Sequence, residues 1–119
     1  MERIKNPLFT TKYTYVRGGN KSDHNVTAFH DYEVRRTADD ELLAEIHFQQ
    51  GPVKEDGVNG VMGEDLLLMV IDRLEKFQAG PFACSENALA LTNLEQAVMW
   101  LRKRTLTREA REVEGTHEV

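Results

Sequence analysis

The spacing of apolar residues along the chain changes near residue 60. Before this point the chain is polar, has no sustained apolar run of helical period, and carries Gly18-Gly19 and Gly51-Pro52, so strands and loops are expected there. After it, apolar residues recur every three or four positions, as in amphipathic helices. The pattern predicts an α+β fold, in which an N-terminal antiparallel β-sheet is followed by a C-terminal antiparallel two-helix hairpin.

The clearest strands are two runs that contain β-branched and aromatic residues, Tyr32–Arg36 and Leu42–Phe48, separated by Ala38-Asp39-Asp40. Such a spacing predicts a β-hairpin. The second run alternates between apolar and mostly polar positions, with His47 on the polar side, so one face is expected to be buried. An earlier run, Val26–Phe29, either extends the first strand or forms its own.

A glycine-rich stretch, Gly57–Gly63, is predicted to be the loop between the two halves. A phosphate-binding loop would need a lysine and a serine or threonine after the glycines, whereas Glu64 and Asp65 follow here and would repel phosphate. These acidic residues instead suit the positive N-terminal end of a helix.

The helical half contains two segments joined by a short connection. The first helix is predicted over Asp65–Gln78, with Gly80-Pro81 ending it. The second is predicted to have Ser85 as its N-cap and to continue to about Arg111. Its apolar seam follows the spacing of a coiled coil and consists of Leu91, Leu94, Val98, Leu101 and Thr105.

A length of 119 residues suits one domain, so we expect a single domain over 1–119, with a strand-rich half at 1–60 and the helical hairpin at 64–112. Twenty acidic against 15 basic residues give a formal net charge of -5, which disfavours binding to nucleic-acid polymers. The single cysteine, Cys84, favours a reducing cytosol. The first twenty residues contain neither a secretory signal nor a membrane span.

Catalytic chemistry is disfavoured by the absence of a suitable cluster. Cys84 starts the second helix but has no histidine near it in sequence, so it is interpreted as a small residue at a helix start. The histidines lack metal-ligand spacing, although His30 and His47 could approach each other across the hairpin. No pair of carboxylates suggests acid–base catalysis. We therefore expect no enzyme, no metal site and no cofactor.

Positive charge is concentrated at the end of the second helix. Five cations lie within ten residues, namely Arg102, Lys103, Arg104, Arg108 and Arg111. The arginines at 104, 108 and 111 share one helical face. They either complement the negative end of the helix dipole and stay solvated, or they clamp an anion, because guanidinium groups bind phosphate bidentately.

Two further residues are candidates for the same site. Asn87 lies in the first turn of the second helix, where free backbone N–H groups favour a polar or anionic ligand, although capping alone would also explain it. Phe77 ends the first helix, where it either stacks on a base or belongs to the core.

A longer pattern runs through the helical half. It consists of Phe77, Gly80, Asn87-Ala88, Leu91, Leu94-Glu95, Met99-Trp100, Arg104, Arg108 and Val113-Glu114-Gly115-Thr116. This pattern resembles the Thoeris anti-defence protein 1 family of bacteriophages, and the hairpin also resembles that of the anti-CBASS protein 2 sponges. The resemblance implies a phage-encoded sponge, working in the host bacterial cytoplasm, that sequesters glycocyclic ADP-ribose, the signal of Thoeris TIR proteins, without degrading it. It also implies a pocket lined by Phe77, Asn87, Arg104 and Arg108.

The spacing of these residues has a consequence for assembly. Asn87 and Arg104 are seventeen positions apart, about 25 Å along a helix that rises roughly 1.5 Å per residue, which is more than a compact nucleotide bridges. Antiparallel packing of two second helices through the seam would bring the Asn87 end of one protomer to the Arg104 end of the other. We therefore expect a homodimer with two pockets, and the resemblance implies further assembly into hexamers.

Two other functions stay open. The protein could bind the cyclic di- and trinucleotide signals of CBASS, alone or together with glycocyclic ADP-ribose in separate pockets. From a different class, it could be a protein-interaction module whose hairpin docks on a phage or host protein. A hydrolase that degrades the signal is disfavoured, since the catalytic cluster is missing.

Overall fold

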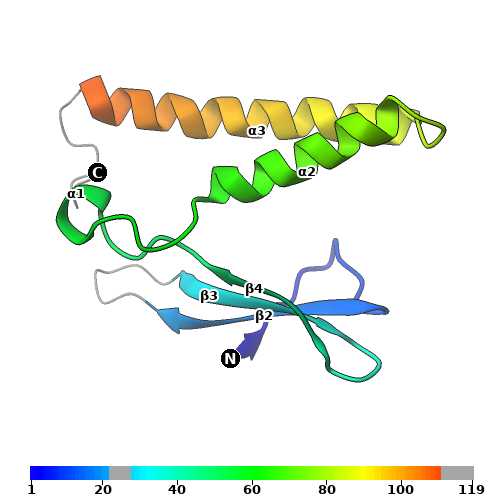
Figure 1. Ribbon diagram of the computed structural model, residues 1–119, viewed down its shortest axis with the longest axis horizontal. Coiled ribbons are helices and arrows are strands. Elements are labelled where there is room, and N and C mark those ends of the chain that lie inside the picture. Colours follow the sequence, from blue (N-terminus) through cyan, green and yellow to red (C-terminus); the bar gives the residue numbers. More distant parts are fainter. Residues whose placement is uncertain (22–27, 111–119) are drawn as a thin grey trace. The chain divides into compact units, whose positions relative to one another are not determined.

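The computed structural model describes residues 1–21 and 28–110, which belong to two compact units divided after Val61 (Figure 1). The first unit, Met1–Val61, contains an antiparallel sheet, and the second, Met62–Val119, contains the helical hairpin. The predicted α+β class, with the sheet before the helices, is therefore confirmed. The prediction of one domain over 1–119 stays a prediction.

The sheet has four antiparallel strands in the order β1-β2-β3-β4. Their bounds are β1 Glu2–Arg3, β2 Thr14–Lys21, β3 Phe29–Arg36 and β4 Leu42–His47. The predicted hairpin is β3 and β4, whose turn is closed by the N–H of Asp40 donating to the carbonyl of Arg36 at 2.8 Å. Of the predicted run at 26–29, Phe29 opens β3, and residues 26 and 27 lie outside the described residues.

Strand β2 was not predicted, because Gly18-Gly19 suggested a loop. In the structure Gly18 lies opposite Tyr32 of β3. A Cβ atom on Gly18 would come within 2.6 Å of the Phe29 ring and 3.1 Å of the Tyr32 ring. Here the missing side chain makes room for aromatic packing across the sheet, so the glycine belongs inside a strand.

A buried carboxylate ties β2 to β3. Glu33 is 9% exposed, and its Oε1 lies 2.5 Å from Nε of Arg17 and 3.1 Å from Nε of Arg35. Hydrogen bonds from Arg35 and then Arg17 lower the pKa of Glu33 to about 2. The carboxylate therefore stays ionised at any physiological pH, as a buried charge requires when it is held between two cations.

The two histidines of the hairpin do not meet. Asp31 is the register partner of His47, and its Oδ1 lies 2.9 Å from Nδ1 of that ring. This hydrogen bond raises the pKa of His47 and lowers that of Asp31. His30 is the neighbour of Asp31 and is buried on the opposite face, since side chains alternate along a strand. Within residues 1–21 and 28–110, no three His, Cys, Asp or Glu side chains are grouped to hold a metal ion.

The first unit ends with a single helical turn, α1 (Val53–Asp56), which the sequence did not predict. The second unit begins with α2 (Gly63–Gln78), two residues earlier than predicted. The carboxylate of Asp65 accepts the N–H of Met62 at 2.8 Å, so Asp65 caps the helix start rather than opening the helix. Gly63, expected in the loop, is already helical.

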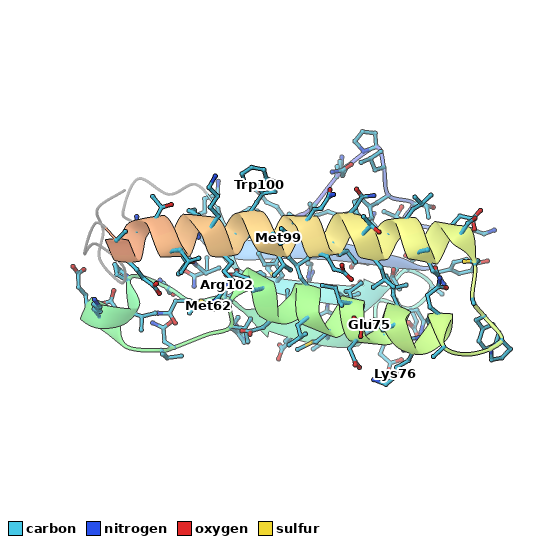
Figure 2. The ribbon with its side chains drawn as sticks, turned by 90° about the horizontal axis from the view of Figure 1, so that it is seen from above. Met62, Glu75, Lys76, Met99, Trp100 and Arg102 are labelled. Atoms are coloured by element: carbon cyan, nitrogen blue, oxygen red, sulfur yellow. The ribbon has the colours of Figure 1, made fainter. Side chains whose placement is uncertain are left out.

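Helix α3 (Ser85–Ala110) runs antiparallel to α2, and the two lie side by side (Figures 1 and 2). The predicted continuation to Arg111 lies outside the described residues. Along α3 the half-buried positions include the whole predicted seam, Leu91, Leu94, Val98, Leu101 and Thr105. The seam therefore packs on α2 within one chain, which corrects the expectation that it joins the second helices of two protomers.

No helix among residues 1–21 and 28–110 is both long and apolar enough to cross a membrane.

Replacing Glu33 by glutamine is expected to lower the free energy of unfolding at pH 7, because two guanidinium groups lose their shared anion. The folded-state pKa of about 2 lies below the ordinary value of 4.5. The carboxylate thus contributes stability above pH 4.5, and this contribution is lost as the pH falls toward 2. Urea denaturation at pH 7 and pH 3 should therefore give a smaller difference between wild type and Glu33→Gln at the lower pH.

The matched control is Glu45→Gln. Glu45 is exposed and lies opposite Glu33 in the register of β3 and β4, so its neutralisation removes a like-charge neighbour and should not destabilise the sheet. Equal destabilisation by both variants at pH 7 would contradict this account of Glu33.

Candidate ligand-binding site

The end of the hairpin where α2 turns into α3 is held by one side chain. The amide of Gln78 donates to the carbonyl of Cys84 at 3.0 Å and accepts the N–H of Cys84 at 2.9 Å. This reciprocal pair closes the connecting loop and joins the last residue of α2 to the residue before α3. We call residues 77–87 the hairpin tip.

The N-cap of α3 is Cys84 rather than the predicted Ser85. Helix α3 begins at Ser85, and the carbonyl of Cys84 accepts the N–H of Ala88 at 3.2 Å. The thiol of Cys84 lies 3.4 Å from the N–H of Asn87. Serine is the better cap by its chemistry, but the bonds from Gln78 fix Cys84 at the position that caps the helix.

Phe77 and Asn87 both lie at the tip and are linked through Phe82. The rings of Phe77 and Phe82 meet edge to face, with centroids 6.1 Å apart and planes at 73°. The amide of Asn87 donates to the carbonyl of Phe82 at 3.5 Å, the limit of a hydrogen bond. Phe82 is 72% exposed, so the tip presents an aromatic surface next to an amide and the first turn of a helix.

A cation lies on this aromatic surface. The guanidinium carbon of Arg73 is 4.9 Å from the centroid of the Phe77 ring, which is within the range of a cation–π interaction. Sequence reasoning missed both Arg73 and Phe82. The spacing of four residues between Arg73 and Phe77 on one helix is the signal that could have found the first.

Arg104 and Arg108 lie at the other end of α3. Since α3 is continuous from Ser85 to Ala110, Arg104 is about 25 Å from Asn87 at roughly 1.5 Å per residue. Arg104 is exposed and Arg108 is half-buried, while Arg111, the third arginine of the predicted face, lies outside the described residues. The predicted site residues of one chain therefore fall into two separate groups, an aromatic one at the tip and a cationic one at the far end, which we call the candidate half-sites.

The surface of α3 that faces away from α2 is apolar in its middle. Met99 and Trp100 are 69% and 67% exposed, and Figure 2 shows Trp100 directed away from α2. The ammonium group of Lys103 lies 5.1 Å from the centroid of the Trp100 ring. Gln96 and Lys103 lie beside these two side chains, so the apolar part of this surface is small.

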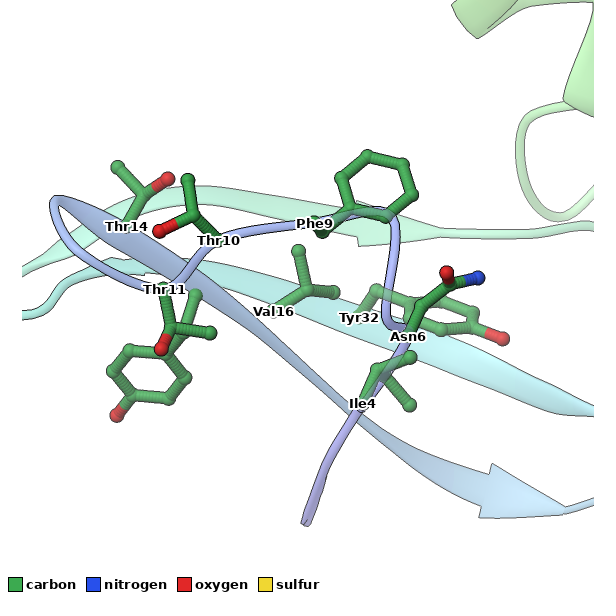
Figure 3. Close-up of a pocket in the computed structure, with 9 residues that line it drawn as sticks. Ile4, Asn6, Phe9, Thr10, Thr11, Thr14, Val16 and Tyr32 are labelled. Atoms are coloured by element: carbon green, nitrogen blue, oxygen red, sulfur yellow. The ribbon is translucent and has the colours of Figure 1, made fainter.

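The first unit contains a cavity of about 250 Å³ beneath the N-terminal segment (Figure 3). Its lining is aromatic, aliphatic and hydroxylic, with one amide, and includes Asn6, Phe9, Val16 and Tyr32. No charged side chain of the described residues lines it, so it does not fit a phosphorylated ligand.

Fold and half-sites together define a small α+β protein built around a helical hairpin, with an aromatic tip and a cationic far end. The family model described as "Acb2/Tad1, hairpin domain" matches residues 40–106. Over 112 residues the chain is 51% identical to "Thoeris anti-defense 1" of Bacillus phage SBSphiJ7. The matched region covers 94% of this chain and 72% of that protein. The chain therefore belongs to the Acb2/Tad1 hairpin family of phage anti-defence proteins, as the sequence pattern predicted.

Replacing Cys84 by serine is expected to stabilise the hairpin by about 0.5–1 kcal/mol, because a hydroxyl is a stronger acceptor for the N–H of Asn87 than a thiol. Thermal or urea denaturation measures the change. Cys84→Ala is the matched control and should be less stable than wild type, since it has no acceptor. A serine variant no more stable than the alanine variant would contradict Cys84 as the N-cap.

Proposed function

We propose that this protein is a sponge that binds glycocyclic ADP-ribose, the signal of Thoeris TIR proteins, inside the host bacterium and sequesters it without degrading it. Membership of the anti-defence family supports this function. The chemistry of the two half-sites supports it independently, since a cyclic ADP-ribose offers a base, riboses and a pyrophosphate. An aromatic ring suits the base, an amide suits a ribose or base edge, and guanidinium groups suit the pyrophosphate.

The observation that carries the proposal is the continuity of α3, which keeps the half-sites of one chain about 25 Å apart at roughly 1.5 Å per residue. A compact nucleotide cannot contact both. We infer that a second protomer completes each site, with its Arg104 and Arg108 facing the Phe77 and Asn87 of the first. A two-fold axis makes two such pockets in each homodimer.

The position of that axis follows from the pairing. For Asn87 of one protomer to face Arg104 of the other, two antiparallel α3 helices must cross near residues 95 and 96. Ala90, Ala97 and Arg104 are spaced by seven residues, so they form one stripe of α3, and Ala97 lies beside the crossing point. Small side chains there allow two helices to approach closely. We therefore infer that this stripe, and not the seam that α2 covers, forms the contact between the two α3 helices.

Sequestration requires that the protein bind the nucleotide, and it requires no chemical step. Arg104 and Arg108 bind the pyrophosphate, Phe77 stacks on the adenine, and Asn87 hydrogen-bonds a ribose or base edge. Removing a signal from its receptor requires a dissociation constant in the nanomolar range, about 12 kcal/mol of binding free energy. Charge-assisted hydrogen bonds together with one stacking ring are adequate for this range in a pocket that two chains close.

Incubation with glycocyclic ADP-ribose followed by heat denaturation should return the intact molecule, measured by liquid chromatography and mass spectrometry. Recovery of an opened or hydrolysed product would instead identify an enzyme. Wild-type protein that captures only cyclic di- or trinucleotides would point to the CBASS sponge.

Arg104→Ala should weaken binding of glycocyclic ADP-ribose roughly 100-fold, since a bidentate charge-assisted contact is lost. Calorimetry measures the affinity, and circular dichroism verifies that α3 remains folded. Arg102→Ala is the matched control, because Arg102 is an exposed arginine two residues away and thus on another face of the helix. Equal affinity of wild type and Arg104→Ala would remove Arg104 from the site.

Mixed dimers test the shared pocket directly. Chains carrying Phe77→Ala and chains carrying Arg104→Ala are co-expressed with different tags, and the mixed dimer is purified through both. One of its two pockets then contains Phe77 and Arg104 in wild-type form, while the other lacks both. We expect one ligand per mixed dimer at wild-type affinity and weak binding by each parent. Weak binding by the mixed dimer as well would mean that each pocket lies within one chain.

A further inference from the structure

We propose that Arg73 is a third guanidinium group of the ligand site, supplied by the protomer that also supplies Phe77 and Asn87. It binds the pyrophosphate of the nucleotide from the side opposite to Arg104 and Arg108. This inference rests on the proposed function and names a residue that determines how the same site holds its anion.

The contact between Arg73 and Phe77 fixes where the cation lies. Its guanidinium carbon lies over the ring, 4.9 Å from the centroid, so the cation covers one face of Phe77 and we expect the base to stack on the other face. The ring of Phe82, 6.1 Å from that of Phe77, extends the same aromatic surface. A cation held by an aromatic ring is oriented before any ligand arrives, which reduces the entropy lost on binding.

The N–H donors of Arg73 are available for a ligand, whereas the neighbouring cation Lys76 is already paired with a carboxylate. Lys76, on the same helix, lies 2.7 Å from the carboxylate of Asp72. Arg73 is exposed and forms no ion pair with any residue in the part of the chain that the structure describes. A guanidinium group that interacts with a ring keeps its N–H donors for an anion, and they match the oxygens of a phosphate group.

Acidic residues near the hairpin tip explain why a cation such as Arg73 is needed there. Glu75 and Glu86 lie near the tip on α2 and α3, and both are exposed. Without Arg73 the aromatic half-site would present acidic residues to a ligand with two negative charges. With Arg73, the pyrophosphate meets guanidinium groups from both protomers, which is the arrangement that neutralises it from two sides.

The test compares two variants of Arg73 in calorimetric titration with glycocyclic ADP-ribose. Arg73→Met keeps an unbranched apolar stem against the Phe77 ring but removes the charge and the donors, whereas Arg73→Lys keeps the charge as a point cation. We expect Arg73→Met to bind roughly 10- to 100-fold more weakly than wild type and Arg73→Lys to recover part of the loss. The matched control, Lys76→Met, removes a cation three residues away that is paired with Asp72 and should bind as wild type does.

Three outcomes separate the possible failures. If wild-type protein does not bind glycocyclic ADP-ribose, the proposed function itself fails. If wild type binds and Arg104→Ala does not, but Arg73→Met retains full affinity, the function stands and the role of Arg73 is refuted. If Arg73→Met and Lys76→Met lose affinity equally, the effect is one of general charge and the specific contact is refuted.

Discussion

The packing of α2 against α3 is the constraint on which the second unit and its candidate site depend. The seam from Leu91 to Thr105 is half-buried along its whole length and closes the hairpin within one chain. It holds α3 as one helix of 26 residues, and a helix of that length keeps its two ends far apart. The aromatic tip, at the N-terminal end of α3, and the cationic far end of α3 are therefore held about 25 Å apart at roughly 1.5 Å per residue.

The sequence predicted both hairpins, β3–β4 and α2–α3, and both are present. It did not predict β1, β2 or α1, and the buried face expected in β4 is wrong for its first half, since Leu42 and Ala44 are exposed. The predictions that failed concern residues whose conformation depends on tertiary contacts. Glycine is typical of turns, and only the structure shows that the rings of Phe29 and Tyr32 occupy the space beside Gly18. Cysteine is a poor N-cap by propensity, and only the hydrogen bonds from Gln78 explain why Cys84 holds that position.

The candidate site residues could be chosen from the sequence, but their grouping in space could not. Phe77, Asn87, Arg104 and Arg108 were chosen from the helix ends and the family pattern and remain a prediction, and the structure places them in two groups at opposite ends of α3. Phe82 was missed because a loop residue has no periodic signal, and its place beside Phe77 depends on the closed tip. Arg73 was missed because one arginine on a helix is usually solvated, and only its distance from the Phe77 ring distinguishes it.

Positive charge is unevenly distributed along the chain. An acidic protein with a formal net charge of -5 repels polyanions at long range, yet its α3 ends in Arg102, Lys103, Arg104 and Arg108. Within one chain these cations lie far from the aromatic rings of the tip. In the proposed dimer, the cationic end of one chain supplies a local attraction for a small anion, while the net charge of -5 opposes the binding of nucleic-acid polymers. The proposed function therefore needs a local cluster of cations and not a basic protein.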